Sequence, residues 1–141
     1  MKAFLDTSSL LKLCHREIGS DVVHDAISDG VEEIFLSEIA VLEFRSAIWK
    51  KVREGEINEK IAVKVISCFQ NDYYGFQWVK LRSDTIETAS ALLMKYGNKG
   101  LRTLDSLQLA STLTLNNEDC IFLTSDNLLK SLFKEENLII V

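Results

Sequence analysis

The feature that most constrains the fold is an alternation of short, continuously apolar runs with longer segments of helical periodicity. Apolar runs without polar alternation are typical of strands in a sheet that is buried on both faces. The helical segments between them are long enough to return the chain parallel to the preceding strand. These runs occupy residues 2–5, 33–36, 76–81, 119–124 and 138–141. We therefore expect an α/β fold with a mainly parallel sheet flanked by helices on both faces.

The chain is expected to form one domain over residues 1–141. Its 141 residues contain no proline and only 6 glycines, so no flexible linker divides them. Polar residues that suit helix N-caps precede several of the helical patterns. The expected caps are Ser37, Asn58, Ser83, Thr103 and Asp126.

Composition limits the partners and the compartment that we expect. The formal net charge is −5, from 16 basic and 21 acidic side chains, which argues against binding of nucleic acid by bulk charge. The 3 cysteines fit neither a zinc motif nor a disulfide framework, which favours reduced core residues in a cytoplasmic protein. No apolar run approaches the roughly 18 residues that span a membrane, and no signal peptide opens the chain.

Four acidic residues are predicted to gather at one edge of the sheet. Asp6 ends the first apolar run, and Asp126 ends the fourth. Asp105 lies in the first turn of the helix leading into the fourth run, and Glu43 in the second turn of the helix after the second run. Parallel strands end at a common edge, which is where ligands bind in sheets of this kind.

Three of these acids also have a purely structural explanation. Asp6 and Asp126 are suitable N-caps for the helices that follow them. Asp105 lies where the helix macrodipole favours an anion. Taken singly, each of the three is therefore as well explained by capping as by chemistry.

Glu43 is harder to explain as a structural residue. Its neighbours on the same helical face are Ile39, Ala40 and Ala47, so its carboxylate is not expected on a solvated surface. A carboxylate in such surroundings needs a partner. Lys50 shares the face but lies about two turns away, roughly 10 Å along the axis, which is too far for an ordinary salt bridge. A metal ion is a candidate for the missing partner.

A cluster of four carboxylates needs a cation, and its donor set favours Mg²⁺ or Mn²⁺, one or two ions. Hard divalent cations take oxygen ligands, and no cluster of histidine and cysteine favours zinc. Such ions activate a bound water and stabilise a leaving oxygen. The cluster therefore suits phosphoryl chemistry.

Five segments of the chain resemble the PIN domain and, within that family, the toxin nucleases of VapBC toxin–antitoxin pairs. Four of them carry the acids in the order that the family has them. The segments are FLDTSSLLKL at residues 4–13, LSEIAVLEFRSAI at 36–48, LRTLDSLQLASTL at 101–113, FLTSDNLL at 122–129 and NLIIV at 137–141.

The resemblance implies a magnesium- or manganese-dependent endoribonuclease, a homodimer and a cognate antitoxin that inserts a segment near the acidic pocket. It also implies a five-stranded sheet in the order 3-2-1-4-5. Asn127 follows the last acid where some members carry another acid, so the number of ions stays open. The implied metal ligands and catalytic residues are Asp6, Glu43, Asp105 and Asp126, with Ser8 and Thr124 supporting them.

RNA must meet positive charge, and two basic residues are the leading candidates for that contact. Lys50 shares a helical face with Glu43, and Arg102 precedes Asp105 by three residues. Both are otherwise explained as solvated surface charges. Trp49 and Trp78 are expected to pack in the core.

Other functions were compared with this one. A receiver domain needs an acid pair after the first strand, and a haloacid-dehalogenase-type phosphatase needs a second Asp two positions after the first. Thr7 and Ser8 occupy those positions, which argues against both. Two alternatives stay open: a non-catalytic module that binds RNA or protein, and a nuclease that acts on DNA.

Overall fold

Helices and strands alternate in the expected order in the computed structural model, which describes residues 1–116 and 118–141. The elements are β1 (Lys2–Leu5), α1 (Thr7–Cys14), α2 (Ser20–Ser28), β2 (Glu33–Ser37), α3 (Ala40–Arg53), α4 (Glu59–Asp72), the 3-10 helix η1 (Tyr73–Gly75), β3 (Gln77–Val79), α5 (Ser83–Tyr96), the 3-10 helix η2 (Gly97–Lys99), α6 (Thr103–Leu113), β4 (Cys120–Leu123) and α7 (Asn127–Glu135). No helix among these residues is long and apolar enough to cross a membrane.

The sheet is parallel throughout, and its strands follow the order β3-β2-β1-β4. The α/β fold and this part of the expected order are confirmed. The expected fifth strand is wrong for the described residues, where the sheet has 4 strands. Asn137 turns the chain with φ 60°, and the segment after it meets β4 only at a parallel bridge between Phe122 and Ile140. One bridge does not make the run of paired residues that defines a strand.

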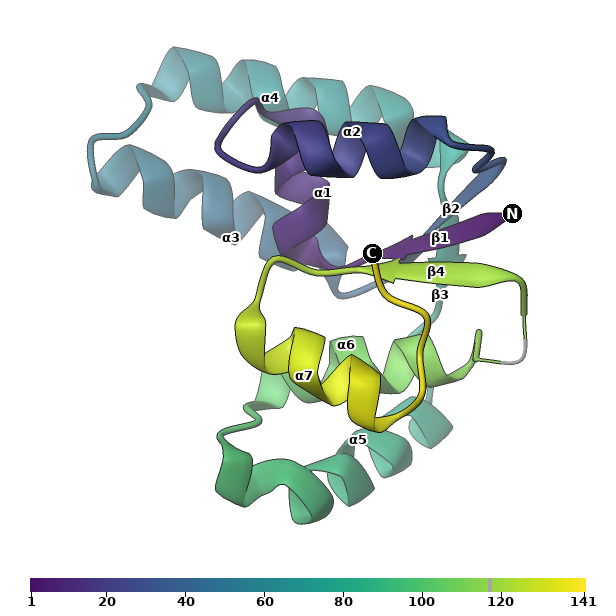
Figure 1. Cartoon of the computed structure of the whole chain (residues 1–141). Coiled ribbons are helices and arrows are strands. Elements are labelled where there is room, and N and C mark those ends of the chain that lie inside the picture. The colour runs from purple at the N-terminus through teal and green to yellow at the C-terminus, as the bar shows by residue number, and fades with distance from the viewer. Residues whose placement is uncertain (117) are drawn as a thin grey trace.

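Helices cover both faces of the sheet (Figure 1). Alternate side chains of β1 point to opposite faces, because the side-chain period of a strand is two. Ala3 and Leu5 pack into the core beneath α1 to α4, whereas Phe4 packs into the core beneath α5 to α7. Phe44 of α3 stacks on Phe69 of α4, with ring centroids 4.4 Å apart. The sheet is thus buried on both sides, as its apolar strands require.

Two of the five expected helix caps are correct. Asn58 and Asp126 accept hydrogen bonds from the N–H groups of Ile61 and Leu129, each at 2.8 Å. Ser37 instead ends β2. Ser83 and Thr103 are the first helical residues of α5 and α6 rather than their caps. At the start of α5, the Thr85 hydroxyl accepts the Arg82 N–H at 3.1 Å, which supplies the missing cap from inside the helix.

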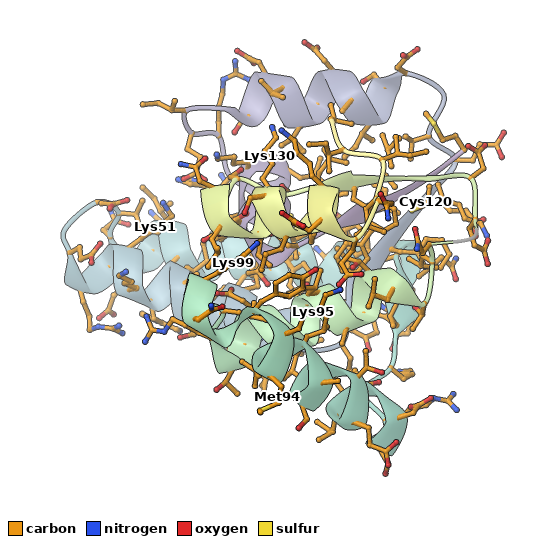
Figure 2. The ribbon with its side chains drawn as sticks, turned by 60° about the horizontal axis from the view of Figure 1, so that its bottom comes forward. Lys51, Met94, Lys95, Lys99, Cys120 and Lys130 are labelled. Atoms are coloured by element: carbon orange, nitrogen blue, oxygen red, sulfur yellow. The ribbon has the colours of Figure 1, made fainter. Side chains whose placement is uncertain are left out.

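Contacts between α5, η2 and α7 hold the last helix in place. Tyr96 donates a hydrogen bond to Glu136 at 2.8 Å, and Lys95 lies 3.0 Å from the same carboxylate. Lys99 lies 3.5 Å from Glu135, and Figure 2 labels both lysines beside α7. Exposed ion pairs add little stability singly, so the half-buried tyrosine contact is the stronger of these. Together they fix the helix whose first turn reaches the carboxyl edge of the sheet.

Two expectations about individual side chains are wrong. Trp49 is 38% exposed rather than packed in the core, because it lies on the outer side of α3. Cys68 is exposed on α4, whereas Cys120 is buried and Cys14 is half-buried. Trp78 is half-buried, and its indole N–H donates to the carbonyl of Tyr73 at 3.1 Å.

Candidate functional site

Asp6 is the most buried of the four acids, with 3% of its surface exposed. It follows β1 directly and caps α1, because its Oδ1 accepts the Ser9 N–H at 3.0 Å. The same oxygen accepts the Ser8 hydroxyl at 2.7 Å, and Oδ2 accepts the Thr124 hydroxyl at 2.5 Å. Asp6 therefore caps a helix and also lies at the carboxyl edge of the sheet.

The chain after β4 is tied to the chain after β1. The Thr124 hydroxyl, besides donating to Asp6, accepts the Asp126 N–H at 3.0 Å. The Ser8 hydroxyl accepts the Ser125 N–H at 2.9 Å. These bonds join two neighbouring strand ends through hydroxyls and backbone groups. Ser8 and Thr124 thus contact the acid that the sequence pairs them with.

Glu43 is half-buried on α3, and its partners are neutral. Its Oε1 accepts the Thr7 hydroxyl at 3.0 Å and the Gln108 side-chain amide at 2.8 Å. The expectation that Lys50 lies too far away is correct, because Lys50 pairs with Glu54 at 3.9 Å on the exposed side of α3. Glu43 therefore has hydrogen-bond donors but no positive partner among the described residues.

Asp105 and Asp126 complete the rim in different ways. Asp105 is half-buried in the first turn of α6 and lines a pocket of about 640 Å³ together with Glu43 and Arg102. Asp126 is exposed and caps α7, as its structural explanation requires. The four acids thus come from four separate stretches of chain that meet at one edge of the sheet.

Burial destabilises three of these acids as anions, and repulsion by neighbouring acids adds to this effect for Glu43 and Asp105. Burial raises the pKa of Asp6, against the hydrogen bonds from Thr124 and Ser8. Burial also raises the pKa of Glu43, and the charges of Asp105 and Asp6 add to that rise. The pKa of Asp105 is raised by burial and then by Asp126, while the Arg102 guanidinium opposes the rise. A cation at this edge would relieve all of these effects.

Of the two basic candidates, Arg102 lies at the acids and Lys50 does not. Arg102 lines the pocket that holds Glu43 and Asp105. A second pocket, of about 220 Å³, adjoins Thr124 and is lined by Lys12 and Lys130. No aspartate or glutamate is among the residues that line this second pocket. Basic side chains therefore line both of these pockets.

The donor set fits a hard divalent ion in its chemistry. All four acids offer carboxylate oxygens, and the hydrogen bonds to Glu43 within the described residues fall on Oε1 alone. Oε1 of Gln108 is a buried oxygen with no partner there. Among the described residues, there is no group of three or more Asp, Glu, His or Cys side chains close enough to one another to hold an ion. The residues fit the ion, although their side chains do not form a coordination shell.

Thr7 and Gln108 are the site residues that the sequence analysis missed. Gln108 is 2% exposed and lies in the apolar stretch LQLA, where a polar side chain of this size needs a partner. That mismatch was the available signal. Thr7 had no comparable signal, because its neighbours are hydroxyl residues that suit the start of any helix.

The family model described as the PIN domain matches residues 3–133. The chain also resembles solved structures. FitAB bound to an IR36 DNA fragment is 15% identical with a TM-score of 0.72, over 99% of this chain and 93% of that one. Mycobacterium tuberculosis VapC20, a toxin that cleaves the Sarcin-Ricin loop, is 13% identical with a TM-score of 0.70, over 92% and 94%.

A third similar structure is Rickettsia felis VapBC2 bound to a DNA fragment from its promoter. It is 14% identical with a TM-score of 0.65, over 100% of this chain and 98% of that one. At such identities the likeness concerns the fold alone. No curated protein sequence matches this chain.

Proposed function

Because the chain belongs to the PIN-domain family, we propose that it is a metal-dependent endoribonuclease and the toxin of a toxin–antitoxin pair. We propose further that residues 1–141 act as one nuclease domain. The observation that supports it is the meeting of Asp6, Glu43, Asp105 and Asp126 at the carboxyl edge of the sheet. Burial raises the pKa of the first three, and repulsion by neighbouring acids adds to that rise for Glu43 and Asp105. None of the four acids forms a salt bridge among the described residues, and acids gathered in this way suit a site that receives cations.

These four acids would hold one or two Mg²⁺ or Mn²⁺ ions. When bound, the ions would supply an activated water and neutralise charge that develops on the phosphate. Asp6 would act from a fixed position, because Ser8, Ser9 and Thr124 hold both of its oxygens. Arg102, in the pocket with Glu43 and Asp105, would bind a phosphate of the substrate.

RNA is the substrate that we favour. One similar structure is that of a toxin that cleaves the Sarcin-Ricin loop, an activity that belongs to that protein. In this chain, Lys12 and Lys130 line the pocket beside Thr124 and Arg102 lines the pocket beside Asp105, so a nucleic-acid backbone at the acids would have basic side chains near it in both pockets. Lys50 is the weaker candidate, since Glu54 already pairs with it. The RNA would be met in the cytoplasm.

An antitoxin and a second copy of the chain are the proposed protein partners. Structures of two similar proteins are VapBC assemblies, which supports a partner of the antitoxin kind. An antitoxin segment would compete with RNA at the pocket that Glu43, Arg102 and Asp105 line. The homodimer follows from the family resemblance.

Cleavage of matched RNA and DNA hairpins tests this function and separates it from its alternatives. The purified protein and its Asp6→Asn variant are incubated with each hairpin in Mg²⁺, in Mn²⁺ or in EDTA. We expect cleavage of RNA by the wild type in either metal, and no cleavage in EDTA or by the variant. Binding without cleavage in every metal would favour a binding module, and cleavage of the DNA hairpin alone would favour a DNA nuclease.

A further inference from the structure

Three side chains from three helices form a closed set of hydrogen bonds behind the acidic pocket. Gln108 of α6 donates through Nε2 to Oε1 of Glu43 at 2.8 Å and to Oγ1 of Thr7 at 3.1 Å. Thr7 of α1 in turn donates its hydroxyl hydrogen to the same Oε1 at 3.0 Å. Both donors therefore converge on one oxygen of one carboxylate.

The cost of this arrangement falls on Gln108. The residue is 2% exposed, and its Oε1 has no hydrogen-bond partner among the described residues. A buried carbonyl without a partner destabilises a fold, and an apolar residue of similar size would avoid that cost. Unlike an apolar residue, the glutamine supplies two N–H donors. Those groups act on Glu43 and Thr7 and on nothing else that the structure describes.

We propose that Gln108, together with Thr7, is a positioning residue that fixes Glu43 through Oε1 and leaves Oε2 to receive the divalent ion. This inference rests on the proposed function. Residues that orient metal ligands by hydrogen bonds affect metal affinity without touching the ion. Neither Gln108 nor Thr7 is an acid, so neither adds charge to the site. Both act through the position of one carboxylate.

Binding of Mn²⁺ to the folded protein, followed by electron paramagnetic resonance at one fixed pH, tests the proposal without reference to cleavage. Gln108→Leu removes the donors at similar volume, and Thr7→Val removes the hydroxyl. We expect the Kd for Mn²⁺ to rise about 10- to 100-fold in Gln108→Leu. A smaller rise is expected in Thr7→Val. Thr7→Ser keeps the hydroxyl and should bind as the wild type does.

The matched control is Ser111→Ala. Ser111 lies one turn further along α6, is fully buried and donates to the Ser37 hydroxyl at 3.0 Å, but makes no hydrogen bond to an acid among the described residues. We expect this variant to lower the midpoint of thermal unfolding and leave the Kd for Mn²⁺ unchanged. Gln108→Leu should weaken binding of Mn²⁺, whereas its thermal stability combines two opposite effects, the lost hydrogen bond to Glu43 and the removal of the unpartnered carbonyl.

The outcomes separate this inference from the function on which it rests. Wild-type protein that binds no Mn²⁺ would overturn both. A wild type that binds Mn²⁺ and a folded Gln108→Leu variant with the same Kd would overturn the positioning role alone. The same conclusion would follow if Ser111→Ala weakened Mn²⁺ binding as much as Gln108→Leu, because a general loss of packing would then explain both.

Discussion

The hydroxyl of Thr124 donates a 2.5 Å hydrogen bond to Oδ2 of Asp6, across 118 positions of the sequence. It joins the ends of β1 and β4 and turns a carboxylate that would only cap α1 into one held from both sides. A hydrogen bond to a charged group contributes more than one between neutral groups. The fold and the site are therefore coupled at this contact.

Replacement of Thr124 tests that coupling. Thr124→Val keeps the shape and removes the hydroxyl, so the free energy of unfolding should fall by about 1.5–3 kcal/mol, the usual range for a bond to an ionised group. Thr124→Ser should lose much less, because the hydroxyl remains. Urea unfolding at pH 8 measures both, and a Thr124→Val variant as stable as the wild type would mean that this hydrogen bond does not contribute.

The metal-free protein should be less stable at neutral pH than in mild acid, because of Asp6. Burial raises the pKa of Asp6 above its ordinary value of 3.8, so the folded chain holds a proton that the unfolded chain has lost. That contribution to stability is present below pH 3.8 and disappears as the pH rises through the folded-state pKa. Asp6→Asn removes the titration and keeps an oxygen for the Ser9 N–H.

Urea unfolding of the two proteins in EDTA, at several values between pH 4.5 and 8, measures this effect. The difference in free energy of unfolding, variant minus wild type, should increase as the pH rises. The reason is that the wild type must ionise the buried Asp6, whereas Asp6→Asn has no group to ionise there. Glu43 acts in the same direction, because loss of the Asp6 charge in the variant removes one cause of the raised pKa of Glu43. A difference that stays constant with pH would contradict a raised pKa of Asp6.

Divalent ions should stabilise the wild type and not a protein that lacks two of the acids. Binding to the folded state alone adds about 2.7 kcal/mol at a free-ion concentration of 100 times Kd. The midpoint of thermal unfolding should therefore rise with Mn²⁺ for the wild type and stay unchanged for Asp6→Asn/Asp105→Asn. Ca²⁺ in place of Mn²⁺ would report how selective the site is. An equal rise in both proteins would assign the ion to another place.

Arg102 and Lys50 should differ in their effect on RNA binding. Arg102 lines the acidic pocket, whereas Lys50 pairs with Glu54. In the Asp6→Asn background, Arg102→Ala should weaken binding of a single-stranded RNA and reduce the salt slope by about 0.7, the value for one phosphate contact. Lys50→Ala should change neither quantity. Fluorescence anisotropy over a range of salt concentrations decides between the two residues.

The thiols should differ in reactivity. Burial raises the pKa of Cys14 to about 12 and that of Cys120 to about 11, so both remain thiols at pH 8. Cys68 is exposed. A disulfide reagent should therefore modify Cys68 rapidly in the folded protein and the other two only on unfolding. A Cys68→Ser variant that still reacts quickly would show that a core thiol is accessible.

The sheet could be predicted from the sequence because its strands, such as those that contain Ala3 and Phe122, are continuously apolar. Such runs indicate strands that are buried on both faces. The prediction of a last strand at residues 138–141 was wrong for a reason that lies outside those residues. Their composition suits a strand, but the turn at Asn137 limits their pairing with β4 to one bridge. Pairing of this kind depends on how the chain enters the segment, which apolar character does not record.

The acids could be predicted to meet because each follows a strand that ends at this edge or lies near the start of a helix that begins there. The donors to Glu43 could not. Thr7 lies 36 positions away and Gln108 lies 65 positions away, and the direction of each side chain depends on how three helices pack. The prediction that the Glu43 carboxylate needs a partner is correct. The partners that the structure provides are neutral.

We propose that these four acids cleave RNA with the help of a divalent ion. The most direct test of this proposal is incubation of total bacterial RNA with purified wild type and with Asp6→Asn/Asp105→Asn, each in Mn²⁺ and in EDTA, followed by gel electrophoresis. We predict discrete fragments with the wild type in Mn²⁺ and intact RNA in the other three reactions. The same fragments from wild type and from a folded double variant would contradict the account, because the acids would then have no part in the cleavage.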